Sequence, residues 1–181
     1  MNPLTKVRDE NGKLTIYPWP EDIYWGNPLA NTLADSKDKA YKVFTNNYVN
    51  ISIPWVDGLQ YKLNTGVNYA NRERNSYFGR DTKSGKEDGG RSDSRNRVDN
   101  NFLVENILSY TKEFGKHNIF ATALYSYQKD NWEEHRIQAQ GFPNDVLTWH
   151  QASTGNLVDP SSGYQNENLI SQMLRLNYSY D

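Results

Sequence analysis

The stretch LQYKLNTGVNYANRER, residues 59–74, alternates between apolar and polar side chains almost without exception. One parity is largely apolar and consists of Leu59, Tyr61, Leu63, Thr65, Val67 and Tyr69. The other parity is polar or small and consists of Gln60, Lys62, Asn64, Gly66, Asn68, Ala70, Arg72 and Arg74. Because successive side chains of a strand point to opposite faces, this pattern predicts a β-strand with one apolar and one polar face. The apolar face could cover a soluble core or contact lipid, and one strand does not decide between the two.

The amino-acid composition limits the classes of protein to which the chain can belong. Only 36% of the 181 residues are hydrophobic and 23% are charged, which is a low apolar content for a packed core. Aromatic residues reach 13%, far above the level of a disordered chain. The net charge of -2, without a basic cluster, gives no footprint for nucleic acid, and the absence of Cys excludes disulfides and thiolate metal sites. No apolar run reaches the roughly 20 residues of a transmembrane helix, but a barrel strand crosses with about 10.

Five segments with a two-residue period predict five strands, near residues 41–55, 59–78, 100–113, 117–140 and 168–181. Short turns separate the first strand from the second and the third from the fourth. Long loops rich in Gly, Asp, Asn and Ser occupy residues 79–99 and 141–167, and residues 1–40 form an opening loop. In an antiparallel meander all short turns then lie at one end and all long loops at the other, which is typical of outer-membrane β-barrels. We therefore expect an all-β, antiparallel up-and-down meander that forms an open sheet.

In a barrel of this kind the apolar parities contact lipid and the polar parities face water. The lipid-facing candidates are Leu59, Tyr61, Leu63, Val67, Tyr69, Leu174, Leu176 and Tyr178, together with Ile51 and Ile53. The candidates that line the lumen or contact a plug are Lys62, Asn64, Asn68, Arg72 and Arg74. The fourth segment is apolar on both parities at first, so its faces are not assigned.

Aromatic residues near strand ends suit the aromatic girdles of a transmembrane barrel, which lie at the membrane interfaces, where one part of a ring contacts lipid and another part contacts water. Trp55 and Tyr110 lie next to the tight turns and fit this position best. The general preference of Tyr for strands explains four others equally well, namely Tyr41, Tyr77, Tyr178 and Tyr180.

Essentially the whole chain resembles a known family. The stretches that carry the resemblance are IYPWPEDIYWGNPLANTLAD (16–35), YKVFTNNYVNISIPWVDGLQYKLNTGVNY (41–69), FLVENILSYTKEFGKHNIFATALYSYQ (102–128), GFPNDVLTWHQAS (141–153) and SQMLRLNYSYD (171–181). They are similar to SusC/RagA-type TonB-dependent outer-membrane transporters of Bacteroidetes. The last stretch is the most specific, and in that family it is a strand in the middle of a much longer barrel.

The resemblance implies a partial segment of a 22-stranded transmembrane barrel that encloses a plug domain. Five strands cannot close a barrel, for which about eight are the minimum, so we expect residues 1–181 to be an internal fragment without the plug. Residues 1–40, 79–99 and 141–167 would be extracellular loops. The implied partners are outer-membrane lipid, a SusD-like lipoprotein and, through the missing N-terminal part, the TonB–ExbB–ExbD complex. The implied cargo is an oligosaccharide or a peptide.

The sequence shows no catalytic or metal-binding pattern, and we expect neither an enzyme nor a cofactor. The three histidines, His117, His135 and His150, have no ligand spacing and no paired nucleophile. Loop residues with ring faces, carboxylates and amides nearby are better candidates for substrate contact, and they are Trp19, Tyr24, Trp25, Trp149 and Asp145. Packing between loops is the alternative for these residues. The alternative function is a soluble or surface-attached all-β glycan-binding module, whose apolar face a second sheet would have to cover.

Overall fold

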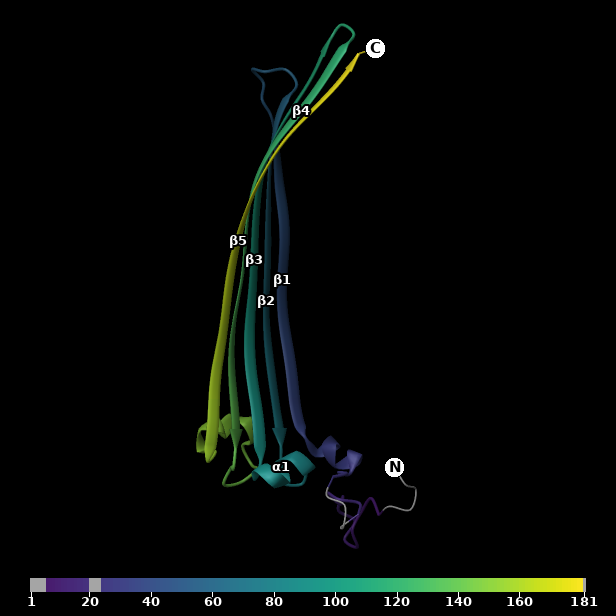
Figure 1. Ribbon diagram of the computed structural model, residues 1–181, viewed down its shortest axis with the longest axis vertical. Coiled ribbons are helices and arrows are strands. Elements are labelled where there is room, and N and C mark those ends of the chain that lie inside the picture. The colour runs from purple at the N-terminus through teal and green to yellow at the C-terminus, as the bar shows by residue number, and fades with distance from the viewer. Residues whose placement is uncertain (1–5, 20–23, 181) are drawn as a thin grey trace. The chain divides into compact units, whose positions relative to one another are not determined.

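Five long strands, paired in sequence order, form the sheet of the computed structural model, which describes residues 6–19 and 24–180 (Figure 1). They are β1 (Asp35–Ser52), β2 (Leu59–Phe78), β3 (Arg91–Phe114), β4 (His117–Gln140) and β5 (Leu157–Tyr180). Three short helices lie at the loop ends of the strands: η1 (Pro28–Leu33), α1 (Lys83–Asp88) and η2 (Thr148–Thr154). The all-β antiparallel meander is thus confirmed, with β1 and β5 as the two edges of the described sheet. Among the described residues, no helix is both long and apolar enough to cross a membrane.

Three strands begin earlier than predicted. β2 and β4 match the predicted bounds, but β1 begins at residue 35, β3 at 91 and β5 at 157 instead of 41, 100 and 168. Residues 91–99 and 157–167 are therefore strand and not loop, and the connecting loops shorten to 79–90 and 141–156. The reason is that these extensions lack a regular apolar alternation: those of β1 and β3 are almost wholly polar, and the apolar residues of the β5 extension, Leu157, Val158 and Tyr164, follow no two-residue period. Their strand conformation depends on pairing with the neighbouring strand, which hydrophobic alternation does not report.

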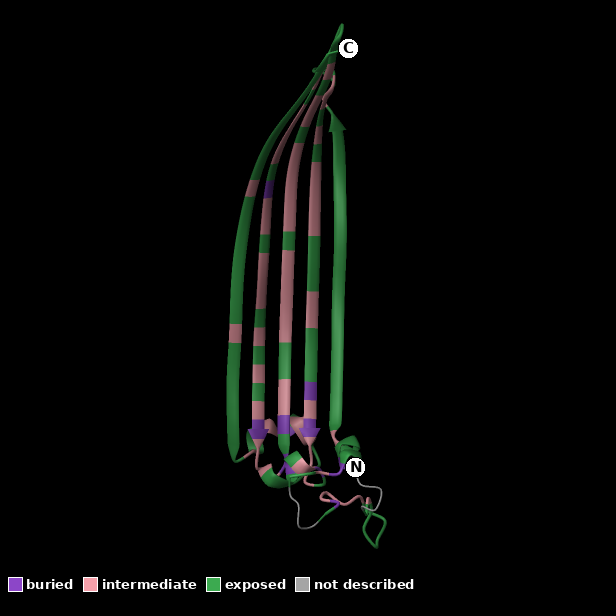
Figure 2. Cartoon of the chain, turned by 45° about the vertical axis from the view of Figure 1, so that its right-hand side comes forward, coloured by how far each residue is buried: buried purple, intermediate pink, exposed green. Residues whose placement is uncertain are grey.

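The chain divides into two compact units, which are described separately. The loop unit contains residues 1–40, 72–97 and 134–163, and the turn unit contains residues 41–71, 98–133 and 164–181. Both long loops belong to the loop unit, and both short turns belong to the turn unit. Figure 2 shows that buried residues gather where β2, β3 and β4 end at the loops, while β1 is exposed along its length. Of the described residues in the turn unit, only Ser126 is buried.

The core of the loop unit lies between the two long loops. Tyr77, Ala139 and Phe142 are each only 3% exposed, and the rings of Tyr77 and Phe142 pack edge to face at 5.3 Å between centroids. Backbone hydrogen bonds tie the loops together, with the Phe142 amide donating to the Gly89 carbonyl at 3.0 Å. Tyr77 is therefore a buried ring of the loop core, and of the two explanations that the sequence left open for it, the girdle does not apply. Its position at a strand end concealed the fact that a later loop covers it.

The two tight turns both use a glycine with left-handed backbone, Gly58 (φ 84°) and Gly115 (φ 62°). The Gly58 carbonyl accepts a hydrogen bond from the Thr111 amide at 2.9 Å, so the β1–β2 turn is anchored on β3. Beside it, Lys112 Nζ lies 2.5 Å from Asp57 Oδ2, and this hydrogen bond lowers the pKa of the Asp57 carboxyl. A Cβ at Gly58 would lie 1.8 Å from the Thr111 carbonyl oxygen, whereas a Cβ at Gly115 would meet nothing within 4 Å.

The different space around Gly58 and Gly115 predicts that the same substitution lowers the free energy of unfolding by different amounts. Gly115→Ala should cost about 1–2 kcal/mol, because only the left-handed backbone is penalised. Gly58→Ala should cost about 2–3 kcal/mol, because the turn must also move away from β3. Urea unfolding of both variants of the protein measures the difference. Equal losses would show that the contact with Thr111 does not hold the turn.

Candidate functional site

Side-chain contacts between β2 and β3 assign the two faces of the turn unit. Tyr61 Oη donates to Asn106 Oδ1 at 2.6 Å, so the odd residues of β2 share a face with the even residues of β3. On the other face Asn64 Nδ2 donates to Glu105 Oε2 at 2.8 Å. The apolar parity of β2 thus lies beside the apolar parity of β3, and the polar parities lie together.

The remaining strands of the turn unit follow the same division. On β1, the Tyr48 ring lies 5.1 Å from Lys62 Nζ, on the polar face. On β4 and β5, Tyr127 Oη donates to Asn168 Oδ1 at 3.0 Å, which places the odd residues of β4 with the even residues of β5. Asn101 Nδ2 also donates to Asp130 Oδ1, which places the even residues of β4 with the odd residues of β3 on the polar face. Together these contacts assign the faces of the fourth strand, which the sequence left open.

The lipid-facing candidates of the sequence analysis that lie within the strands are all on the apolar face of the turn unit. It carries Val43, Val49, Ile51, Leu59, Tyr61, Leu63, Val67, Tyr69, Phe102, Val104, Leu108, Tyr110, Ile119, Tyr125, Ile170, Leu174, Leu176 and Tyr178. Leu174 is 82% exposed and Leu176 69%, so these side chains do not converge on a closed interior. The sheet order contains no second sheet to cover them within residues 6–19 and 24–180.

This apolar surface has two limits along the strands. Toward the loops it ends at rings such as Tyr41 and Tyr69, and the next positions of the same parity are polar, namely Lys39, Asn71, Asn100, Lys129 and Asn168. Toward the turns it ends near Tyr110 and Tyr178, with Trp55 in the adjacent turn. A tilted strand crosses a bilayer with about 9–11 residues, and the stretch from Leu59 to Tyr69 has this length.

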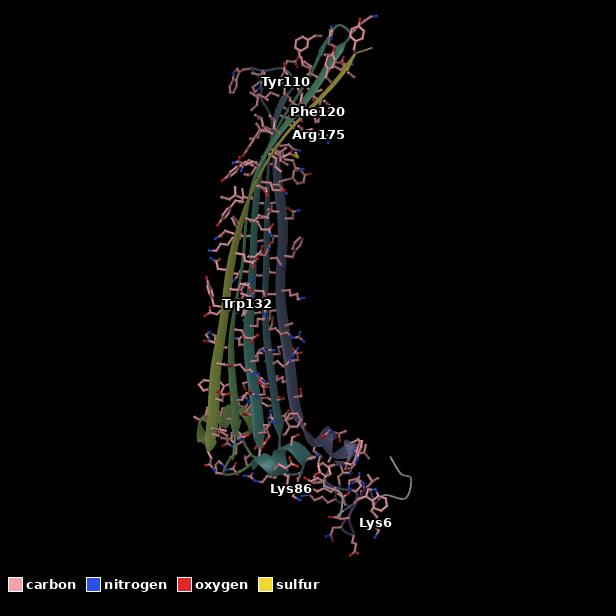
Figure 3. All side chains as sticks on the ribbon, in the orientation of Figure 1. Lys6, Lys86, Tyr110, Phe120, Trp132 and Arg175 are labelled. Atoms are coloured by element: carbon pink, nitrogen blue, oxygen red, sulfur yellow. The ribbon has the colours of Figure 1, made fainter. Side chains whose placement is uncertain are left out.

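The polar face of the turn unit contains a shallow cavity of about 280 Å³. Its lining includes Asn68, Asp99, Asn101, Asp130, Trp132, Gln165 and Glu167. Trp132 Nε1 donates to Gln165 Oε1 at 2.9 Å (Trp132 is labelled in Figure 3). A ring face among amides and carboxylates suits a solute with hydroxyl or amide groups. The sequence analysis missed Trp132, since only the pairing of β4 and β5 shows which face it occupies.

In the loop unit the polar face carries cross-strand ion pairs. Arg72 forms a bidentate pair with Asp38, with Nε 2.9 Å from Oδ1 and Nη2 2.5 Å from Oδ2, and Arg74 Nε lies 3.4 Å from Asp38 Oδ2. Arg95 Nη2 lies 2.8 Å from Glu134 Oε1. These pairs join the polar extensions of β1 and β3 to their neighbours and explain why the extensions are strands.

Two further pairs link β3 with β4 on the same face. Arg136 Nε donates to Asp93 Oδ1 at 2.9 Å, and Arg97 Nη1 lies 4.0 Å from Glu134 Oε2. All of these guanidinium groups remain partly exposed, from 36% for Arg136 to 53% for Arg72.

The loop candidates separate into two groups. The Asp145 carboxylate accepts hydrogen bonds from Tyr77 Oη at 2.8 Å and from the Arg80 amide at 3.1 Å, and it pairs with the Arg80 guanidinium. Trp149 packs against the core formed by Tyr77 and Phe142. For Asp145 and Trp149 the contacts are those of the loop-packing alternative. Trp19, Tyr24 and Trp25 are 44%, 84% and 73% exposed, and contact with substrate stays a prediction for them.

The N-terminal segment of the loop unit lies against α1 and the preceding turn. Lys13 Nζ lies 2.7 Å from Asp81 Oδ1, and this hydrogen bond raises the pKa of Lys13. Tyr17 Oη donates to Glu87 Oε1 at 3.0 Å, and desolvation raises the pKa of Tyr17. Lys86, labelled in Figure 3, lies 5.0 Å from the centroid of the Tyr17 ring.

Comparisons with known proteins agree with this architecture. No family model matches the chain. It is 28% identical over 179 residues to the TonB-dependent receptor P3 of Formosa agariphila, covering 98% of this chain and 18% of that protein.

Solved structures show the same fold. The RagAB peptide transporter superposes with a TM-score of 0.76 at 21% identity, covering 95% of this chain and 20% of that one. The RagAB peptide importer in the closed-closed state superposes with a TM-score of 0.75 at 20% identity, again covering 95% and 20%. The chain thus spans about a fifth of the length of the proteins it matches. These proteins are receptors and transporters, which are not enzymes, in agreement with the sequence analysis.

Proposed function

We propose that the chain is a segment of a SusC/RagA-like TonB-dependent receptor and forms part of the barrel wall of an outer-membrane importer of oligosaccharides or peptides. The observation that carries the proposal is the division of the turn unit into an apolar face without a covering sheet and a hydrogen-bonded polar face. In a soluble module such an apolar face would need a partner layer. In a barrel, lipid covers it and water or the plug occupies the other side.

The proposed orientation follows from the two units. In outer-membrane barrels the short turns face the periplasm and the long loops face the outside, and we assign the turns and loops of this chain in the same way. A SusD-like lipoprotein would contact the extracellular side, and the TonB–ExbB–ExbD complex would act through a plug elsewhere in the full-length protein. Peptide cargo has support from the solved neighbours, which are named peptide transporter and peptide importer. Glycan cargo has support from Trp132 and its amide neighbours on the polar face.

Site-directed spin labels test which face meets lipid. The chain has no native Cys, so Leu63→Cys and Asn64→Cys each give this segment one attachment site. The labelled full-length transporter is placed in lipid vesicles. Oxygen concentrates in the bilayer, so we expect it to raise the spin relaxation rate of a nitroxide at residue 63 more than a water-soluble relaxation agent does. A nitroxide at residue 64 should be protected from oxygen, because its side chain lies on the face of Glu105.

A third label at Leu174→Cys serves as a replicate on β5, where the apolar face is predicted to continue. Labels at residues 63 and 174 that respond only to a water-soluble relaxation agent would contradict the barrel wall. That result would favour the soluble or surface glycan-binding module.

A further inference from the structure

The sequence contains a single Asn that is followed by Gly, and this pair lies in the turn of a small hairpin of the loop unit. An antiparallel bridge joins Arg8 to Leu14, and Asn11 and Gly12 are in the turn between them. Every residue from 8 to 13 is exposed. The pair is therefore in contact with water, and its chemistry is that of an exposed turn.

The side-chain amide of an Asn reacts most readily when the next residue is Gly. The attacking atom is the backbone nitrogen of that next residue, and a Cβ there shields the nitrogen. Gly12 has no Cβ, and a Cβ built on it would meet no atom within 4 Å apart from its chain neighbours. Its φ of 78° lies in the left-handed region that favours glycine. Neither a side chain at residue 12 nor a distant residue therefore blocks the approach.

Two hydrogen bonds of the turn restrain this pair. The backbone amide of Gly12 donates to the Asp9 carbonyl at 3.0 Å, and the backbone amide of Asn11 donates to Asp9 Oδ1 at 3.0 Å. The first bond must open before the Gly12 nitrogen can attack. Exposed backbone hydrogen bonds with few buried contacts around them belong to the least stable parts of a protein, so this bond opens far more often than one inside the sheet.

We propose that Asn11 is a site of spontaneous deamidation. The Gly12 nitrogen attacks Cγ of Asn11 and closes a five-membered succinimide ring, while the bond from Cγ to Nδ2 breaks. Nδ2 leaves as ammonia and takes the proton of the Gly12 amide. Water then opens the ring at either carbonyl carbon, which gives aspartate or isoaspartate. The net reaction consumes one water and releases one ammonia.

The reaction changes the charge and the length of the turn. Both products carry a new carboxylate next to the acidic side chain of Asp9, and isoaspartate adds one carbon to the main chain. The present turn is fixed by Arg8 Nη1, which donates to the Gly12 carbonyl at 2.6 Å, and by the Lys13 amide, which donates to Asp9 Oδ1 at 2.8 Å. The modified turn is close to Asp81, because the Lys13 side chain pairs with it at 2.7 Å.

Peptide mapping by mass spectrometry tests the proposal on the folded protein. Conversion at residue 11 is followed as a gain of about 1 Da, since an amide NH2 group becomes a hydroxyl group. The internal control is Asn75, which also precedes a small residue, Ser76, but is 6% exposed within β2 and donates through Nδ2 to Glu73 Oε1 at 2.7 Å.

We expect Asn11 to convert at least about tenfold faster than Asn75, because the turn opens more easily than the strand. Both isoaspartate and aspartate should form, since water can open the ring on either side. The rate should rise with pH, because the attacking nitrogen loses its proton. Asn11→Gln keeps an amide but would need a six-membered ring, so conversion at residue 11 should fall to the level of Asn75.

Three results would overturn the proposal. The first is a rate at Asn11 no higher than that at Asn75 in the folded protein. The second is aspartate without isoaspartate, which would indicate direct hydrolysis of the side chain by water. The third is conversion of Asn11 in urea but not in the folded protein, which would show that the turn holds the Gly12 nitrogen away from Cγ. None of these results bears on the proposed function, which rests on the faces of the turn unit.

Discussion

Leu63→Arg in the proposed full-length transporter is expected to lower the free energy of unfolding of the barrel by about 2–4 kcal/mol, as a lipid-facing charge does near the bilayer midplane. Leu63 lies midway along the apolar stretch that ends at Tyr69, so the charge would be far from both interfaces. Its neighbour Asn64 lies on the opposite face, where Nδ2 donates to Glu105. Asn64→Arg should cost far less, because the charge keeps its hydration and gains an acidic neighbour.

Both variants are refolded into lipid vesicles and unfolded with urea. This measures the loss in free energy of unfolding for each variant under the same conditions. Equal losses, or a greater loss at residue 64, would show that the parity of residues 59–74 does not separate lipid from water. The membrane assignment would then depend only on the comparison with related receptors.

Tyr77→Ala is expected to weaken the packing of the two long loops by about 3–5 kcal/mol, the usual cost of deleting a buried aromatic side chain. The Tyr77 ring is 3% exposed, packs on Phe142 and bonds the Asp145 carboxylate. The effect should be local, because the loop core belongs to the loop unit alone. Hydrogen exchange of the Phe142 amide, which donates to Gly89, should accelerate by roughly a hundredfold to a few thousandfold, since each 1.4 kcal/mol is a factor of about ten.

Tyr77→Phe is the matched control. It keeps the ring and removes only the hydroxyl that donates to Asp145, so it should cost about 1 kcal/mol. If Tyr77→Ala left exchange at Phe142 unchanged, the loops would be held by the Asp145–Arg80 pair and the backbone bonds, and the aromatic core would be unimportant.

The sequence predicted those parts of the fold that local patterns encode. β2 alternates cleanly and begins directly after the Gly58 turn, and both of its predicted ends agree with the structure. β4 is bounded by the Gly115 turn and by Gly141, and its ends were also predicted correctly. Short turns with left-handed glycines force consecutive strands to pair, so the meander order followed from the turns.

The sequence missed the first residues of β3 and β5 for a physical reason. A strand without a regular apolar alternation gives no periodic signal, and its ladder is stabilised by pairs such as Arg95–Glu134 and Arg136–Asp93. The partners are far apart in the chain, and their pairing depends on the register of two hairpins. For the same reason the sequence does not predict which face Trp132 occupies or that Tyr77 is covered by a loop far away in the chain.

The amino-acid sequence by itself determined the fold class, the order of the strands and which parities of the regular strands are apolar, because periodicity and turn chemistry act over a few neighbouring residues. Only the tertiary structure decided which face the fourth strand presents, which loop residues pack on each other and where the arginines gather. Those outcomes depend on strand register and loop docking. Both are set by contacts between residues such as Arg72 and Asp38 or Tyr77 and Asp145, whose separation in the chain exceeds any local pattern.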